Sequence, residues 1–142
     1  MHYKTLGIIT LILALFMSGC ALEPMPEVST PEVSTPAPTS YQTITAEEAH
    51  TMMEESDGFI LLDVRTMEEY LEAHIEGAVL LPNESIDETT AKEVLPQKDA
   101  QIFLYCRTGR RSAEAAGKLF SLGYTNVYDF GGIVDWPYDV VK

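Results

Sequence analysis

Apolar runs of strand length alternate with amphipathic segments from residue 43 to the C-terminus. The runs are continuous, as expected for strands buried on both faces of a parallel sheet. This order predicts an open α/β sheet, mostly parallel, with helices on both faces and ligands at the carboxyl ends of its strands. The expected strands span residues 59–64, 78–81, 101–106 and 126–130, and the expected helices span residues 45–56, 66–73, 85–95 and 112–123.

Three of these helix ends carry typical capping residues. Thr45 and Glu48 have the spacing of a capping box, in which each side chain bonds the other residue's backbone N–H. Thr66 precedes a short acidic segment and fits an N-cap. Gly123 follows the last periodic residues of its segment, where glycine commonly ends a helix.

The N-terminal segment has a different pattern. Residues 5–17 are almost wholly apolar, but the run is shorter than the roughly 20 residues of a membrane-spanning helix. It ends in the sequence MSGC at 17–20, which resembles the lipobox of bacterial lipoproteins. We therefore interpret residues 1–19 as a lipoprotein signal peptide and Cys20 as the lipidated residue. An uncleaved signal anchor is the alternative, and both interpretations place the rest of the chain outside the cytoplasm.

Residues 20–42 are expected to form a tether that follows the lipidated cysteine. Pro, Ser, Thr, Glu and Val dominate this segment, and the unit PEVST occurs twice, at 26–30 and 31–35. Such a composition buries too little apolar surface to fold, and its prolines favour extended polyproline II. The remaining residues, 43–142, form the one expected domain.

Charge narrows the choice of partners. The chain has a net charge of −13, which argues against nucleic acid or anionic lipid as a partner of the domain itself. Against this background, three of the domain's arginines fall within residues 107–111, directly after Cys106. The cluster predicts a site for a small anion rather than a solvated basic face.

Cys106 lies at a predicted turn from strand to helix, in the sequence QIFLYCRTGRRS. Gly109 allows a positive φ in this turn, and the helix that follows offers free N–H groups and the positive end of its dipole. Together with the arginines, these features favour the thiolate form of a cysteine. We therefore expect a nucleophilic cysteine in an anion-binding loop.

The cysteine count supports this hypothesis. The chain has two cysteines, and lipidation of Cys20 would leave Cys106 as a lone thiol outside the cytoplasm, which is unusual for a structural residue. A buried, inert cysteine is the alternative. No metal and no cofactor are expected.

Four motifs, read together, resemble the single-domain rhodaneses, a family of sulfurtransferases. The resemblance implies a five-stranded rhodanese fold in which Cys106 is catalytic, and substrate is bound by the loop residues Arg107, Thr108, Gly109, Arg110 and Arg111. Ala73 stands where the family usually has glycine. The motifs are LLDVRTMEEY at 61–70, AHIEGAVLLP at 73–82, YCRTGRRS at 105–112 and GGIVDW at 131–136.

The family's reaction implies a small anionic sulfur donor, such as thiosulfate or a polysulfide. Cys106 would take its outer sulfur as a persulfide and pass it to cyanide or another thiol. The protein is expected to act as a monomer. Of the loop arginines, Arg107 and Arg111 are the favoured pocket residues, and at least one arginine is expected to face water.

Other residues in the motifs have weaker assignments. Asp63 and Arg65, at a strand end, either support the active loop by hydrogen bonding or form an ion pair that closes the domain. His74 is expected to be a turn residue, because a thiolate needs no general base. Trp136 is expected in the core or on the pocket rim, and Tyr105 is expected to pack.

Three other functions remain open. A cysteine phosphatase requires Cys-x5-Arg, but here the last loop arginine, Arg111, falls one place early and Ser112 occupies the sixth position. A non-catalytic or sulfur-carrying interaction module at the cell surface is the second alternative. A redox role through a sulfenic acid or a mixed disulfide is the third, although no second cysteine is available to resolve it.

Overall fold

A computed structural model describes residues 40–142. The predicted signal peptide, the lipidation site at Cys20 and residues 20–39 of the predicted tether lie outside this range. Among the helices that the structure describes, none has the length and apolar character needed to cross a membrane.

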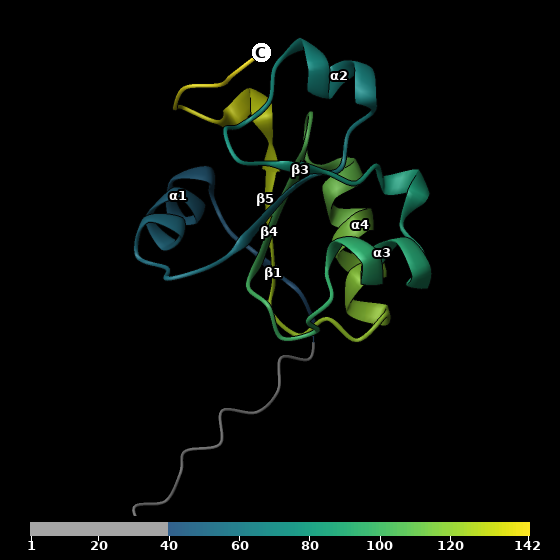
Figure 1. The fold of residues 1–142 in the computed structure, drawn as a ribbon. Coiled ribbons are helices and arrows are strands. Elements are labelled where there is room, and N and C mark those ends of the chain that lie inside the picture. The colour runs from purple at the N-terminus through teal and green to yellow at the C-terminus, as the bar shows by residue number, and fades with distance from the viewer. Residues whose placement is uncertain (1–39) are drawn as a thin grey trace, which may run out of the picture. The chain divides into compact units, whose positions relative to one another are not determined.

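The centre of the domain is a five-stranded sheet in which every pair of neighbouring strands is parallel (Figure 1). The prediction of an open, mostly parallel α/β sheet is therefore confirmed. Because all strands point the same way, their carboxyl ends meet at one end of the sheet. The strands lie in the order β1-β5-β4-β2-β3 and comprise β1 (Gln42–Thr43), β2 (Ile60–Asp63), β3 (Val79–Leu80), β4 (Ile102–Cys106) and β5 (Val127–Gly132).

Helices cover both faces of the sheet, as predicted. In Figure 1, α1 (Ala46–Glu54) lies on one side, and α3 (Glu88–Val94) and α4 (Arg110–Ser121) lie on the other. Side chains of the central strand β4 alternate between the two layers. Ile102, Leu104 and Cys106 pack with α3 and α4, whereas Phe103 and Tyr105 pack with α1.

The short helix α2 (Met67–Glu72) and the C-terminal segment lie together at one end of the sheet (Figure 1). They are joined by an antiparallel bridge, in which the backbones of His74 and Val141 exchange hydrogen bonds of 2.8 and 2.9 Å. Both predicted N-caps are confirmed, since Thr45 and Thr66 each form a complete capping box.

Some local predictions were wrong. The run at 78–81 forms an edge strand, not a buried one, because β3 has a neighbour on only one side and Val79 is 44% exposed. The expected helix at 85–95 is shorter, because α3 begins only at Glu88, after its N-cap Asp87. Ser85 belongs instead to a 3-10 turn at Asn83–Ser85. Helix α4 begins at Arg110, two residues earlier than expected, because Gly109 already takes the N-cap position.

Strand β1 was not predicted. Gln42 and Thr43 have no apolar pattern, and both are exposed. Their strand conformation comes from pairing with β5, where Gln42 and Thr43 lie opposite Tyr128 and Asp129. Gln42, the last residue of the predicted tether, is therefore part of the sheet.

Candidate active site at Cys106

Cys106 is the last residue of β4, at the carboxyl end of the sheet's central strand. The pairing of β4 with β5 shifts register between Leu104 and Cys106, which ends the regular ladder at this point. The residue is 1% exposed, and its Sγ accepts a hydrogen bond of 3.0 Å from the backbone N–H of Gly109. The sulfur thus has a backbone donor directed at it, as a thiolate would require.

The loop turns sharply because Gly109 has a φ of 100°, the left-handed conformation expected from the sequence. This conformation places the first turn of α4 directly after the loop, where N–H groups have no partner within the helix. Buried Ser112 donates from its hydroxyl to the carbonyls of Gly109, at 2.9 Å, and Gly131, at 3.2 Å. The hydroxyl therefore fastens the loop to the end of β5.

The glycine pair at the end of β5 allows the loop to lie close to the sheet. A Cβ on Gly132 would lie 2.8 Å from the Cα of Thr108, which is too close for any side chain. Gly131 has a φ of 87°, and its N–H bonds the Asp129 carboxylate at 3.0 Å. The two glycines of the motif GGIVDW thus allow the end of β5 to pack directly against the backbone of the Cys106 loop.

The three loop arginines have different environments. Arg111 is partly buried and donates two hydrogen bonds, of 2.7 and 2.8 Å, to the carboxylate of Glu69 on α2. Arg110 points along its own helix and pairs with Glu114 at 2.6 Å, with 75% of its side chain exposed. Arg107 and Thr108 are exposed. Arg111 is thus the loop arginine that is partly buried and held by a residue of another element, on the flank of the site.

This ion pair sets the local electrostatics. Hydrogen bonding to Arg111 lowers the pKa of Glu69 to about 2, despite partial burial of the carboxylate. The same bond raises the pKa of Arg111, and attraction to Cys106 adds to the effect. Arg111 therefore stays positively charged next to the sulfur.

Asp63 and Arg65 form a buried ion pair and make no hydrogen bond to the Cys106 loop among those described. The Arg65 guanidinium bonds both carboxylate oxygens of Asp63 at 2.6–3.0 Å and the carbonyl of Ala73 at 2.6 Å. It also lies 5.6 Å from the ring centre of Tyr105. Of the two roles considered for this pair, the geometry matches the ion pair that closes the domain.

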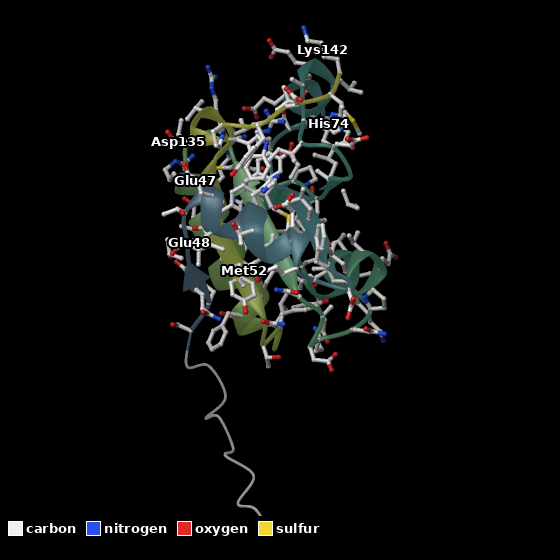
Figure 2. The ribbon with its side chains drawn as sticks, turned by 90° about the vertical axis from the view of Figure 1, so that its left-hand side faces the viewer. Glu47, Glu48, Met52, His74, Asp135 and Lys142 are labelled. Carbon is white, nitrogen blue, oxygen red and sulfur yellow. The ribbon has the colours of Figure 1, made fainter. Side chains whose placement is uncertain are left out.

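The other aromatic residues of the motifs lie in packed positions. Tyr105 is fully buried, its hydroxyl accepts from the N–H of Ile75 at 3.1 Å, and burial raises its pKa. His74 stacks on Tyr70 with ring centres 3.8 Å apart, and its Nδ1 lies 2.9 Å from the Tyr70 carbonyl. Figure 2 labels His74 at the same end of the domain as the C-terminal residue Lys142. Trp136 is partly buried against Phe130.

Glu69 was not identified from the sequence as a site residue. It is 42 positions from Arg111, and the capping box with Thr66 already accounts for a glutamate at this point. No local pattern signals the second role of its carboxylate. Within residues 40–142, no group of three or more His, Cys, Asp or Glu side chains is placed to hold a metal ion.

Comparison with known proteins adds a family assignment to this geometry. The family model described as the rhodanese-like domain matches residues 45–138, which is most of the described part of the chain. The thiosulfate sulfurtransferase PspE of Escherichia coli is 37% identical over 81 residues, covering 57% of this chain and 77% of PspE.

Two further relatives extend the comparison. The probable adenylyltransferase/sulfurtransferase MoeZ of Mycobacterium tuberculosis is 39% identical over 95 residues, which are 66% of this chain but only 24% of MoeZ. Among solved structures, a rhodanese with anions from E. coli superposes with a TM-score of 0.56 at 32% identity. That match covers 60% of this chain and 99% of the E. coli chain.

Proposed function

The chain belongs to the rhodanese-like domain family of sulfurtransferases, and from this premise we propose that it moves sulfane sulfur from thiosulfate or a polysulfide through a persulfide on Cys106. The Cys106 thiolate attacks the outer sulfur of thiosulfate, the sulfur–sulfur bond breaks, and sulfite leaves with the electron pair. Cyanide or a thiolate then attacks the outer sulfur of the persulfide. The Cys106 thiolate is the leaving group of this second step.

The hydrogen bond from the Gly109 N–H to Cys106 Sγ is the observation that carries the proposal. It places the sulfur at the entry of α4, where backbone donors and the helix dipole stabilise negative charge. The persulfide and the regenerated thiolate are both anions at this position. A preorganised donor therefore lowers the free energy of each charged state without rearrangement of the loop.

Arg111 supports an anionic donor. Its charge is fixed by the ion pair with Glu69, and it lies on the flank of the loop that contains Cys106. Both Arg110 and Arg111 have a carboxylate partner, but the partly buried Arg111 is screened less by water and salt than the exposed Arg110. Thiosulfate and inorganic polysulfides are the donors that this charge favours.

A cysteine phosphatase fits the loop less well. From Cys106 to Arg111 the loop is one residue shorter than Cys-x5-Arg, and Ser112 stands at the position where a phosphatase has its arginine. The proposal is therefore sulfur transfer rather than phosphate hydrolysis.

The first test is the variant Cys106→Ala, assayed with thiosulfate and cyanide. Transfer should fall to background, while the circular dichroism spectrum stays that of the wild type. Intact-mass measurement of the wild type after incubation with thiosulfate should show the gain of one sulfur atom, and the variant should show none. Absence of this gain in the wild type would favour a non-catalytic interaction module, and Cys106-dependent phosphate release from an aryl phosphate would favour the phosphatase.

We further propose that Cys20 carries lipid, that the Pro-rich segment after it tethers the domain, and that the reaction takes place outside the cytoplasm on a bacterial membrane. The support is the apolar segment 5–17, which ends in small residues and a cysteine, and the Pro-rich composition that follows. The sulfur donor and acceptor would then both be solutes or proteins of the extracytoplasmic space.

A further inference from the structure

A pocket lies on the α1 side of the sheet, between that helix and the C-terminal segment. Its volume is about 630 Å³, within the usual range for small-molecule sites. Figure 2 faces this side of the domain, with α1 in front of the sheet and the labelled Asp135 and His74 above it. We call it the aromatic pocket; its lining comprises His50, Met53, Glu54, Phe59, Leu61, Ile75, Glu76, Trp136, Pro137, Tyr138 and Asp139.

Three stacked or tilted rings form one wall of the aromatic pocket. His50 and Tyr138 stack with ring centres 3.8 Å apart and planes 19° from parallel. Trp136 meets Tyr138 edge to face at 5.0 Å, and it is anchored on the buried ring of Phe130 at 5.5 Å. The rings thus fix one another's orientation and present polarisable surface to the pocket, which attracts cations.

The charges around the aromatic pocket all have one sign unless His50 is protonated. Of the described residues that line it, three are carboxylates and none is lysine or arginine. Glu54 lies 3.4 Å from His50, whereas Glu76 and Asp139 are exposed and have no ion-pair partner in residues 40–142. Two unpaired carboxylates next to aromatic faces favour a positively charged occupant.

The aromatic pocket shares no lining residue with the Cys106 loop. The acidic rim disfavours thiosulfate and polysulfide, which are anions, so the pocket is unsuited to the proposed sulfur donors. Its floor of Leu61, Ile75 and Met53 is apolar and disfavours a strongly hydrated metal ion or an unsubstituted ammonium. A cation covered by methyl groups fits the aromatic wall, the acidic rim and the apolar floor.

We propose that the aromatic pocket binds small methylated ammonium compounds. The positive group lies against Trp136 and Tyr138, its methyl groups contact the apolar floor, and Glu76 and Asp139 supply the counter-charge. The site is independent of sulfur transfer, so failure of either proposal leaves the other intact.

Trp136 is the only tryptophan of the chain, so its fluorescence reports directly on the pocket. The full chain is titrated at low ionic strength with choline, with its neutral carbon isostere 3,3-dimethyl-1-butanol, and with sodium chloride as an ionic-strength control. Choline should give a saturable change in Trp136 emission. The isostere, which has the same shape without the charge, should bind at least about tenfold more weakly.

Charge and ring variants locate the binding. The pair Glu76→Gln and Asp139→Asn should weaken choline about tenfold, and Tyr138→Leu should weaken it roughly fivefold. The matched control is Glu93→Gln with Asp99→Asn, an equal change in charge at exposed residues outside the pocket, which should leave the affinity unchanged.

Several results would overturn the proposal. Equal binding of choline and 3,3-dimethyl-1-butanol would make the site a neutral apolar pocket. Equal weakening by the control pair would assign the effect to the overall negative charge of the protein. Tighter binding of N-acetyl-lysine amide than of choline would assign the pocket to the unmethylated amine of a protein partner, and the lack of any saturable change would exclude the site.

Discussion

The Arg111 guanidinium joins two parts of the site. It bonds Glu69 on α2 through two nitrogens, and it belongs to the first turn of the helix that follows Cys106. Its charge is therefore held close to the sulfur by a partner from another element. The exposed Arg110, which pairs only with Glu114 along its own helix, lacks this constraint. Two neighbouring arginines thus differ in how strongly they should affect an anionic substrate.

This difference predicts the effect of charge removal on donor choice. Arg111→Gln should lower kcat/KM for thiosulfate about tenfold relative to a neutral organic trisulfide, because the fixed positive charge acts on the anion alone. Arg110→Gln should change that ratio little. Because the first variant leaves Glu69 unpaired, the double variant Glu69→Gln/Arg111→Gln is measured as well. Equal losses for both donors in the single and double variants would contradict an electrostatic role for Arg111.

Glu69 should link stability to pH. Its pKa is lowered to about 2 in the folded state, so its stabilising effect is present above its ordinary pKa and is lost as the pH falls toward 2. Glu69→Gln should lower the free energy of unfolding at pH 7 by about 2 kcal/mol, and the difference from the wild type should shrink below about pH 4. Urea denaturation at pH 7 and pH 3 measures both effects.

Glu72→Gln is the control for this measurement. It removes an exposed carboxylate from the same helix, for which the described residues offer no ion-pair partner. A pH-independent loss in Glu69→Gln would contradict a stabilising role for the Glu69 charge, and an equal loss in the control would assign the effect to the overall charge of the domain.

At the scale of elements, local signals predicted the helices and the central strands well. The capping box at Thr45, the N-cap at Thr66 and the glycine turn at Gly109 depend on residues within three or four positions, and all three are confirmed. Strand β1 and the exposure of β3 were missed, because their structure depends on which strand lies beside them in the sheet. Sequence periodicity carries no information about that order.

For the candidate site too, the features that depend on neighbouring residues could be predicted, and those that depend on packing between elements could not. Cys106 and the turn after it form one continuous segment, so the strand end, the glycine and the helix start could be read together. The ion pair between Arg111 and Glu69 could not be predicted from the sequence, because it depends on how α2 packs beside α4. The hydrogen bond from Arg65 to the carbonyl of Ala73 likewise depends on how the chain folds back after α2, so it could not be predicted from the sequence.

The contact between β5 and the Cys106 loop predicts a sensitive glycine. Gly132→Ala would place a methyl group against the backbone of Arg107 and Thr108, which must shift to make room. The free energy of unfolding should fall by about 1–3 kcal/mol and sulfur transfer should fall with it.

Gly58→Ala is the matched control, because a Cβ at Gly58 meets no atom within 4 Å and its φ is not positive. It should fold and transfer sulfur as the wild type does. Full activity in Gly132→Ala, measured with thiosulfate and cyanide beside this control, would mean that the loop tolerates displacement from the sheet.

At the scale of the whole molecule, an acidic chain contains a small site in which positive charge is concentrated. The net charge is −13, yet the loop after Cys106 holds three arginines. Anions should be repelled by the rest of the surface, so the proposed anionic donors should be attracted mainly at the loop. The predicted N-terminal lipid and tether would determine where the domain is located, and they would take no part in the reaction.

Lipidation is tested on the full chain expressed in a bacterial host. Intact-mass measurement of the wild type should show the loss of residues 1–19 and the added acyl chains, whereas Cys20→Ser should show no acyl chains and should keep its specific activity. A wild-type mass that includes residues 1–19 and no acyl chains would instead support an uncleaved signal anchor.

The direction of β1 determines where the N-terminal segment joins the domain relative to Cys106. The chain enters the sheet at the amino end of β1, which runs parallel to β5, whereas Cys106 lies at the carboxyl end of β4. The point where the chain enters the sheet and Cys106 are therefore at opposite ends of the strands. A domain held by its N-terminus would present Cys106 outward, so solutes and large acceptor proteins could approach it without crossing the supporting surface.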